Sequence, residues 1–303
     1  MSFRKRLSLR DSMKGIIEES LLNLVPKRFD YVGDVAVIYI PAELSAYKGL
    51  IASKLLAMRG NTKAVLNKVS KLEGEHRIAD FELLLGASTE TTHRENGYAY
   101  KLDVKKVFFN PRLYSERKRV ISKITPGEHI IVPFAGVGPF VLPAAGKGAK
   151  VCAIEINPDA CACLRENIRI NKLEGQIIVI QEDFENFLNM FDSAKTDHKV
   201  ENIEFSDQLV CSSLWGDEAF QSAEGGFDRA IVPTPYGMDH FLGGISKLVK
   251  RGGYIHFYTF KAEAQLPGII KEYEKMGFEV EFYRRSGNIA PGISRWVFDL
   301  IKK

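Results

Sequence analysis

From residue 126 onward the chain repeats one pattern, in which a short apolar segment, a turn, a helical segment and another apolar segment follow one another. The apolar segments predict strands at residues 129–132, 150–154, 176–181, 229–232 and 253–260. Helical periodicity lies between or after them, at residues 139–145, 158–171, 238–249 and 266–276. Strands that alternate with helices form a parallel sheet with helices on both faces, so the sequence predicts an α/β, Rossmann-like domain.

The pattern closes with two further strands, predicted at residues 278–283 and 296–301. Pro291-Gly292 lies between them and indicates a turn. We therefore expect an antiparallel hairpin at the edge of the sheet.

The first part of the chain follows a different pattern. It predicts helices at residues 11–24 and 45–58, and strands at residues 34–40, 64–69, 81–85, 90–95 and 98–101. Asn96-Gly97 separates the last two strands and is typical of a two-residue hairpin turn. A chain of 303 residues has room for two domains. We expect a small α+β domain over residues 1–107 and a larger one over residues 108–303.

One segment of the larger domain does not fit the alternation. Residues 189–226 are largely polar and acidic and lie between the third and fourth predicted strands. A connection of about forty residues is uncommon in a compact sheet. We expect an acidic insertion with little fixed structure.

Composition excludes several classes of protein. No apolar segment reaches the roughly 20 residues that a membrane-spanning helix needs, and the basic residues 1–14 contain no apolar signal region. A cytoplasmic location is therefore expected. The cysteines at positions 152, 161, 163 and 211 have neither CxxC spacing nor a histidine partner at zinc-finger distance. We expect no metal site and reduced thiols.

Charge is distributed unevenly along the chain. Residues 1–125 hold 23 basic and 14 acidic residues, which is +9, and the remaining 19 basic and 24 acidic residues give −5, for the total of +4. Residues 184–226 alone carry nine acids and two lysines. A basic N-terminal half favours a phosphate-rich partner such as RNA, although a solvated basic face explains the charge equally well.

A glycine turn and two acids indicate a nucleoside site. The segment Phe134-Ala-Gly-Val-Gly-Pro-Phe140 follows a predicted strand and precedes a helix, and Gly136 and Gly138 let the backbone approach a ligand closely. Glu155 ends the next strand, where an acid accepts hydrogen bonds from ribose hydroxyls. Asp183 follows the third strand and is placed either to accept from an adenine amino group or to cap a helix.

The ligand is better explained as S-adenosyl-L-methionine (AdoMet) than as a dinucleotide. A dinucleotide turn has a third glycine that packs the helix close to the pyrophosphate, and this chain has Val141 in its place. AdoMet carries no phosphate and does not need that glycine.

Several motifs together resemble one family. They are Thr89-Glu-Thr-Thr-His-Arg-Glu-Asn-Gly97, Phe109-Asn-Pro-Arg-Leu113, Glu116-Arg117, the glycine turn, Glu155-Ile-Asn-Pro158 and Glu166-Asn-Ile-Arg-Ile-Asn-Lys172. The combination is similar to the Met-10+ family, the archaeal and eukaryotic tRNA methyltransferases that make N1-methylguanosine at position 37. The resemblance implies a class I AdoMet methyltransferase fold, AdoMet as cofactor and the tRNA anticodon stem-loop as partner. We also expect a monomer with no obligate protein partner.

The resemblance also implies roles for individual residues. Glu116 would be the general base and Arg77, in Gly74-Glu-His-Arg77, its electrostatic partner. The remaining expected positions are Phe134, Gly136, Gly138, Glu155, Ile156 and Asp183 for the cofactor, and Arg112, Arg117, Thr234, Pro235 and Tyr236 for the substrate.

The chemistry requires such groups because guanine N1 carries a proton at neutral pH. A base must remove this proton, while a cation stabilises the charge that develops toward O6. We expect partial burial to raise the pKa of Glu116 toward neutrality. Without the resemblance, the simpler interpretations are a surface Glu116 paired with Arg119 or Lys123 and an Arg77 that only binds phosphate.

The same superfamily includes the wyosine-pathway enzyme that transfers the aminocarboxypropyl group of AdoMet instead of its methyl group. Arg112 and the pair Pro139-Phe140 look like the methylating branch. Aminocarboxypropyl transfer, or methylation of another nucleoside, is the alternative within this class.

Two positions depart from the family pattern. Val132 and Pro133 stand where an acid usually ends the first strand, and Pro233-Thr-Pro-Tyr-Gly237 replaces an Asn-Leu-Pro loop thought to hold the target guanine. Either Thr234, Tyr236 or the backbone recognises guanine here, or the protein acts on another base. A pseudo-enzyme that binds RNA without turnover is the third interpretation.

Overall fold

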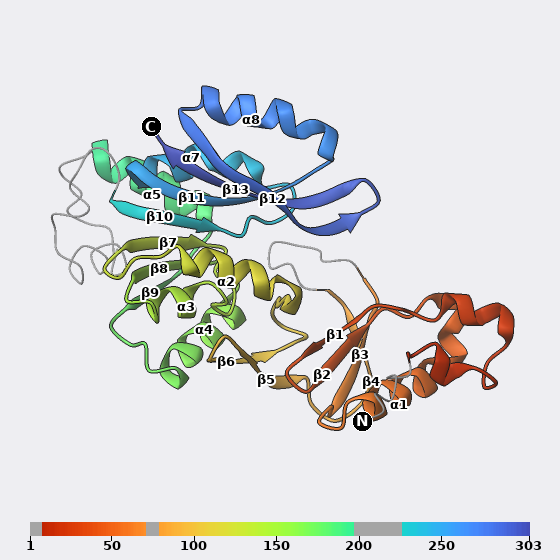
Figure 1. Ribbon diagram of the computed structural model, residues 1–303. Helices are drawn as coiled ribbons and strands as arrows, with labels where there is room; N and C mark the ends of the chain where they lie inside the picture. Colours follow the sequence, from red (N-terminus) through yellow and green to blue (C-terminus); the bar gives the residue numbers. More distant parts are fainter. Residues whose placement is uncertain (1–7, 71–78, 197–225) are drawn as a thin grey trace, which may run out of the picture. The chain divides into compact units, whose positions relative to one another are not determined.

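The computed structural model describes residues 8–70, 79–196 and 226–303, and the chain divides into two compact units, Met1–Arg112 and Leu113–Lys303 (Figure 1). Within the described ranges, no helix combines the length and the apolar composition needed to cross a membrane.

The first unit contains a four-stranded sheet with the order β1-β2-β3-β4. Its strands are β1 (Phe29–Val32), β2 (Val35–Ile38), β3 (Ala64–Lys68) and β4 (Phe81–Leu85). The pair β2–β3 is parallel and is connected through the 3-10 helix η3 (Ala42–Tyr47) and helix α1 (Lys48–Met58), while β1 and β4 pair antiparallel at the two edges.

A separate two-stranded sheet completes this unit. It pairs β5 (Glu90–Glu95) with β6 (Tyr98–Asp103) in antiparallel register. Asn96 and Gly97 form the turn with φ of 51° and 89°, the positive values that a tight primed turn requires. The predicted hairpin is confirmed.

The helix predicted over residues 11–24 is wrong. The structure has two short 3-10 helices instead, η1 (Asp11–Met13) and η2 (Glu19–Leu24). Gly15, at φ +71°, breaks the helical path between them. The apolar periodicity nevertheless marks buried residues, because Met13, Ile17 and Leu22 all lie in the core of this unit.

The second unit contains a seven-stranded sheet with the order β12-β13-β11-β10-β7-β8-β9. Its strands are β7 (His129–Pro133), β8 (Lys150–Glu155), β9 (Ile177–Gln181), β10 (Phe227–Val232), β11 (Val249–Lys261), β12 (Phe278–Ala290) and β13 (Ile293–Lys302). The helices are α2 (Tyr114–Ser122), α3 (Val141–Ala145), α4 (Pro158–Ile170), α5 (Phe184–Thr196), α7 (Leu242–Leu248) and α8 (Leu266–Lys275). Short 3-10 helices are η4 (Pro111–Leu113) at the junction of the units, η6 (Asp239–Phe241) and η7 (Glu263–Gln265).

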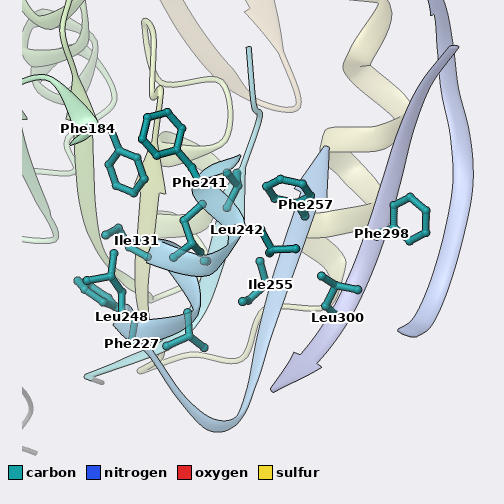
Figure 2. Packing of buried hydrophobic residues seen from close by; sticks show 14 of the residues in the cluster. Ile131, Phe184, Phe227, Phe241, Leu242, Leu248, Ile255, Phe257, Phe298 and Leu300 are labelled. Carbon is teal, nitrogen blue, oxygen red and sulfur yellow. The ribbon is translucent and has the colours of Figure 1, made fainter. Parts of the chain in front are cut away.

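The predicted Rossmann-like arrangement is confirmed. Strands β9, β8, β7, β10 and β11 are parallel to their neighbours, and β13 runs antiparallel between β11 and β12. The hairpin of β12 and β13 forms one edge of the sheet, as expected. Figure 2 shows the core on one face of this sheet, where side chains such as Ile131, Ile255 and Phe257 pack against Leu242 of α7.

The acidic insertion begins later than expected. Residues 184–196 form helix α5, so the start of the predicted insertion is regular structure. Phe184, Phe187, Leu188 and Phe191 recur at helical spacing and pack into the sheet core, and this apolar stripe is the signal that the acidic composition concealed. The rest of the predicted insertion, residues 197–225 with Cys211, lies outside the described residues.

Candidate active site

The glycine turn lies at the carboxyl end of β7. Phe134, Gly136 and Gly138 have φ of 55°, 55° and 92°, so the chain turns sharply through left-handed conformations. A Cβ at Gly138 would lie 2.5 Å from Cδ1 of Leu164 on α4. Gly138 is therefore favoured by its backbone conformation, and any side chain there would also have to displace the end of Leu164.

Glu155 ends the neighbouring strand β8 and holds the turn in place. Its Oε2 accepts the backbone N–H of Gly136 at 2.7 Å, and its Oε1 accepts the N–H of Asn157 at 2.9 Å. Asn157 in turn caps α4 by accepting the N–H groups of Asp159 and Ala160. The carboxylate is thus oriented at the carboxyl edge of the sheet, where parallel α/β sheets bind their ligands.

Three phenylalanines form an aromatic wall at the same edge. The ring centroid of Phe134 lies 5.4 Å from that of Phe184 and 5.7 Å from that of Phe241, and the last two rings are 5.3 Å apart. They come from the segments after β7, β9 and β10. Phe184 and Phe241 are buried in the core and support Phe134, which is only half-buried. The ring of Phe134 near an acid matches the adenine and ribose parts of a nucleoside.

Asp183 is a helix cap in this structure. Its Oδ1 accepts the N–H groups of Glu185 at 2.8 Å and Asn186 at 3.2 Å at the start of α5. The capping interpretation of Asp183 is therefore observed. Ile156, half-buried, directly follows Glu155 at the end of β8.

The expected cofactor residues therefore gather along one edge of the sheet, since they follow the carboxyl ends of β7, β8 and β9. We call this edge, with Phe134, Gly136, Gly138, Glu155, Ile156 and Asp183, the nucleoside edge. The donor set fits AdoMet: it offers a carboxylate for ribose hydroxyls and aromatic surface for adenine, around a turn with no third glycine for a pyrophosphate.

Glu116 lies at the start of α2 and is 3% exposed. Its Oε1 accepts from Nη2 of Arg119 at 2.7 Å and from the hydroxyl of Tyr258 on β11 at 3.1 Å. Its Oε2 accepts from Arg284 on β12, from Nε at 2.9 Å and also from Nη2. The interpretation of Glu116 as a surface residue is wrong.

This carboxylate is one end of a larger buried cluster. Arg119 also donates to both oxygens of Asp299 on β13, at 2.6 and 3.0 Å, and Lys123 donates to Asp299 at 2.9 Å. Asp299 is completely buried and lies 2.6 Å from Nδ1 of His256. Nε2 of His256 contacts Arg229, which pairs with Glu128. The cluster joins α2 to β10, β11, β12 and β13.

The cluster sets the pKa values of its members. Burial on its own would raise the pKa of Glu116, but the hydrogen bonds and charges of Arg119 and Arg284 outweigh it and the pKa is lowered. The expectation of a raised pKa is wrong for the protein without RNA, because two arginines compensate the burial. Burial raises the pKa of Tyr258, and burial lowers the pKa of His256.

Glu116 is connected to the glycine turn by aromatic contact. The ring of Phe140, the last residue of the turn segment, lies 5.8 Å from the ring of Tyr258, whose hydroxyl is bonded to Glu116. The buried acid and the nucleoside edge therefore belong to one continuous packed region of the second unit.

The loop after β10 presents one of its expected substrate residues to solvent. Thr234 is 2% exposed, and both its hydroxyl and its N–H donate to the carbonyl of Val232, so its side chain faces inward. Pro235 is buried as well. Tyr236 is 62% exposed, with its ring 5.4 Å from that of Phe260. Of the three expected substrate residues in this loop, Tyr236 is the one that presents its side chain to solvent.

The expected arginines differ in their surroundings. Arg117, on α2, is 1% exposed, so its guanidinium is buried. Arg112, in the first unit, is half-exposed and its Nε donates to Asp30 at 2.6 Å. It lines a cavity of about 220 Å³ together with Lys68, Phe109 and Asn110. Arg77 lies outside the described residues.

Sequence reasoning did not identify Arg284, Tyr258 or Asp299 as partners of the candidate base. They lie 168, 142 and 180 residues along the chain from Glu116 or Arg119, and no local pattern marks such pairs. Val132, which replaces the family's acid, is completely buried in the sheet.

The sequence matches the models of two known domain families. The TRM5/TYW2 methyltransferase domain matches residues 91–211, and the TYW2 N-terminal domain matches residues 9–89.

Individual relatives point the same way. The chain is 34% identical to the tRNA (guanine(37)-N(1))-methyltransferase Trm5b of Pyrococcus abyssi over 88% of its length and 71% of the relative. It is 32% identical to a tRNA(Phe) (4-demethylwyosine(37)-C(7)) aminocarboxypropyltransferase of Pyrococcus horikoshii over 96% of its length and 95% of the relative. The structure of aTrm5 solved in complex with tRNALeu is 28% identical with a TM-score of 0.78, covering 99% of this chain and 79% of that one. The fold, the nucleoside edge and these matches agree, and the chain belongs to the TRM5/TYW2 family, whose cofactor is AdoMet.

Proposed function

We propose that this protein is an AdoMet-dependent tRNA methyltransferase that methylates N1 of guanosine 37 in the anticodon loop. The observation that carries the proposal is Glu116, a nearly fully buried carboxylate that is packed through Tyr258 and Phe140 against the glycine turn of the nucleoside edge. We further propose that the enzyme acts as a monomer in the cytoplasm, with the anticodon stem-loop as its partner.

The residues of the nucleoside edge hold the cofactor. Glu155 would accept the ribose hydroxyls, Phe134 and Ile156 would contact the adenine, and the turn at Gly136 and Gly138 would pass the amino-acid end. Asp183 would accept from the adenine amino group through the carboxylate oxygen that does not cap α5. When bound, AdoMet supplies a methyl carbon that is electrophilic because it is attached to a sulfonium.

Glu116 would move the proton. The N1–H bond of guanine breaks and the proton passes to the carboxylate, while the freed electron pair of N1 forms the bond to the methyl carbon and the carbon–sulfur bond breaks toward sulfur. Arg77 would stabilise the charge that develops toward O6. The base must leave the anticodon stack to reach the site, and Tyr236 offers an exposed ring for it to stack on.

The test is transfer of tritium from methyl-labelled AdoMet to unmodified tRNA transcripts with G37 or A37. We expect label only with G37, and digestion to nucleosides should identify N1-methylguanosine. Glu116→Gln keeps the size of the side chain and removes the base, so methyl transfer should fall by about 10²- to 10⁴-fold with AdoMet affinity unchanged. Full activity of this variant would reject Glu116 as the base.

Aminocarboxypropyl transfer is the second candidate, and two observations favour it. The first unit matches the TYW2 N-terminal domain, and the chain covers 95% of the Pyrococcus horikoshii aminocarboxypropyltransferase but 71% of Trm5b. In this reaction the nucleophile attacks the carbon of the aminocarboxypropyl group, so the other product is 5′-methylthioadenosine rather than S-adenosylhomocysteine.

Two labels on AdoMet separate the candidates in one assay. Methyl label in the RNA supports the first reaction, and carboxyl label in the RNA, on a transcript or on tRNA that carries the wyosine precursor, supports the second. RNA binding with neither label incorporated would indicate an RNA-binding protein without turnover.

A further inference from the structure

The two arginines that hold Glu116 are not equivalent. Arg119 is 17% exposed and is also bonded to both oxygens of the buried Asp299, so it is fixed from two sides. Arg284 is 40% exposed, and among the residues that the structure describes Glu116 is its sole hydrogen-bond partner. Arg284 is therefore the arginine that can leave without breaking any other bond.

The backbone that carries Arg284 is also the less constrained one. β12 is the outer strand of the seven-stranded sheet, paired only with β13 in the described part of the chain. Its register is irregular between Val280 and Phe282 and again between Arg285 and Gly287, on both sides of Arg284. Irregular outer strands have fewer ladder bonds to hold them.

Charge counting shows what the departure of Arg284 would do. The positive groups around Glu116 are Arg119 and Lys123 on α2 and Arg284 on β12. The negative groups are Asp299 on β13 and Glu281 on β12. Tyr258 and His256 on β11 are uncharged. Arg229 of β10 and its partner Glu128 complete the cluster beyond His256, so four acids and four bases balance while Arg284 is in place. When Arg284 leaves, one positive charge is missing, and a proton taken up by Glu116 restores the balance. A base held by both arginines is a poor proton acceptor, so the reaction needs one of them to move.

We propose that Arg284 is a removable clamp on Glu116, which holds the carboxylate while RNA is absent and moves to a phosphate of the RNA backbone when the substrate binds. The planar guanidinium fork that now grips a carboxylate fits a phosphate equally well. The clamp couples arrival of the RNA to activation of the base. This inference rests on the proposed function, because it takes Glu116 as the base.

The first arm of the test is RNA binding without turnover. Filter binding of tRNA is measured across salt concentrations for the wild type, for Arg284→Gln and for the matched control Arg285→Gln. Loss of one phosphate contact should flatten the plot of log affinity against log salt by about 0.7 to 0.9 in Arg284→Gln. An unchanged slope means that Arg284 is a fixed structural partner and overturns the proposal.

The second arm is the pH dependence of methyl transfer. The acidic limb of kcat/KM reports the free enzyme and that of kcat reports the complex. In the wild type, Arg284 holds Glu116 in the free enzyme but not in the complex, so the acidic limb of kcat should lie at higher pH than that of kcat/KM. In Arg284→Gln the clamp is absent from both states, so the two limbs should lie at the same pH. Arg285 is the adjacent arginine on β12 but pairs with Glu263 and lies over Trp296, so Arg285→Gln should keep the wild-type separation. Limbs that coincide in the wild type, or that stay separated in Arg284→Gln, overturn the proposal.

Two controls complete the design. Calorimetry of AdoMet binding should show no change in Arg284→Gln, whereas a loss of affinity would assign Arg284 to the carboxylate of AdoMet and overturn the RNA assignment. Arg284→Lys keeps the charge without the fork and should retain most of the salt slope. Absence of methyl transfer in the wild type would reject the proposed function alone, since the binding arm judges the phosphate contact without turnover.

Discussion

Glu155 is the residue on which the cofactor edge depends most directly. Its two oxygens hold the backbone on either side of the site, at Gly136 and Asn157, so the side chain both shapes the turn and faces the expected ribose. We therefore propose that one acid shapes the turn and also binds the cofactor ribose.

Replacement of this acid should weaken AdoMet binding. Hydrogen bonds to a charged group contribute about 1.5 to 3 kcal/mol, so Glu155→Ala should weaken binding by roughly 10- to 100-fold by calorimetry. Glu155→Gln, which keeps an acceptor, should lose less. Glu174→Ala, an exposed acid before β9, serves as the control. Equal affinity in Glu155→Ala and the wild type would remove Glu155 from the cofactor site.

Residue types were easier to predict from sequence than residue states. The glycine turn, Glu155 and Glu116 stand out by motif, and the structure gathers the first two at one edge. The ionisation of Glu116 could not be predicted, because it depends on Arg284, which is 168 residues away. Thr234 also could not be placed, since the inward rotation of its hydroxyl toward Val232 is a matter of local backbone geometry.

At the scale of elements, the turn between β7 and α3 packs against α4. Gly138→Ala adds a methyl group 2.5 Å from Leu164 at a φ of +92°, whereas Gly175→Ala, at φ +81°, has no atom within 4 Å of the added methyl group. Both variants should lose about 1 kcal/mol or more from backbone strain. Only Gly138→Ala should also lose AdoMet affinity, measured by calorimetry beside urea unfolding. Similar behaviour of the two variants would show that the contact with α4 is not important.

The buried cluster attaches α2 to four strands, and within it Asp299 of β13 bonds to Arg119 and Lys123 of α2 and to His256 of β11. Removal of one partner from a buried ion pair costs about 3 to 5 kcal/mol, so Asp299→Asn should reduce the free energy of unfolding by about that amount at pH 7. The exposed pair of Asp192 and Lys247 provides the control, because Asp192→Asn should cost less than about 1 kcal/mol.

The cost should depend on pH in one direction. Hydrogen bonds from His256, Arg119 and Lys123 outweigh burial and hold the pKa of Asp299 far below its usual value. Its stabilising contribution is therefore complete above the unfolded pKa of about 3.9 and is lost as pH falls below that value. Urea unfolding at pH 7, 5 and 3 should show the difference between the wild type and Asp299→Asn shrinking at pH 3. A difference that is constant with pH would contradict the assignment.

Elements were predicted where local signals are strong. The apolar runs of the parallel strands and the Asn96-Gly97 turn identified most of the sheet and one hairpin. The four-residue strand β1 was not predicted, since its segment Phe-Asp-Tyr-Val has a single fully buried residue. The helix expected at residues 11–24 is interrupted at Gly15, where tertiary packing of Met13 and Leu22 outweighs helical periodicity.

For the molecule as a whole, charge predicts how RNA binding responds to salt. The first 125 residues carry a net charge of +9. If about six phosphates are contacted, tRNA affinity should fall by at least tenfold over a few-fold rise in salt, as measured by filter binding. A flat response would show that the basic half of the chain does not face the RNA.

The position of β13 has a consequence for synthesis of the protein. This strand, Ile293–Lys302, lies between β11 and β12 and carries Asp299. During synthesis, Arg119 therefore cannot bond to Asp299 until 180 more residues have been added to the chain. Until the ribosome has delivered that strand, β11 has an open side and the guanidinium of Arg119 lacks its buried anion. Contacts between distant segments form slowly and leave strand edges exposed during folding. The nascent chain is therefore exposed to aggregation over a long interval, and that interval ends only when β13 pairs with β11 near one edge of the sheet.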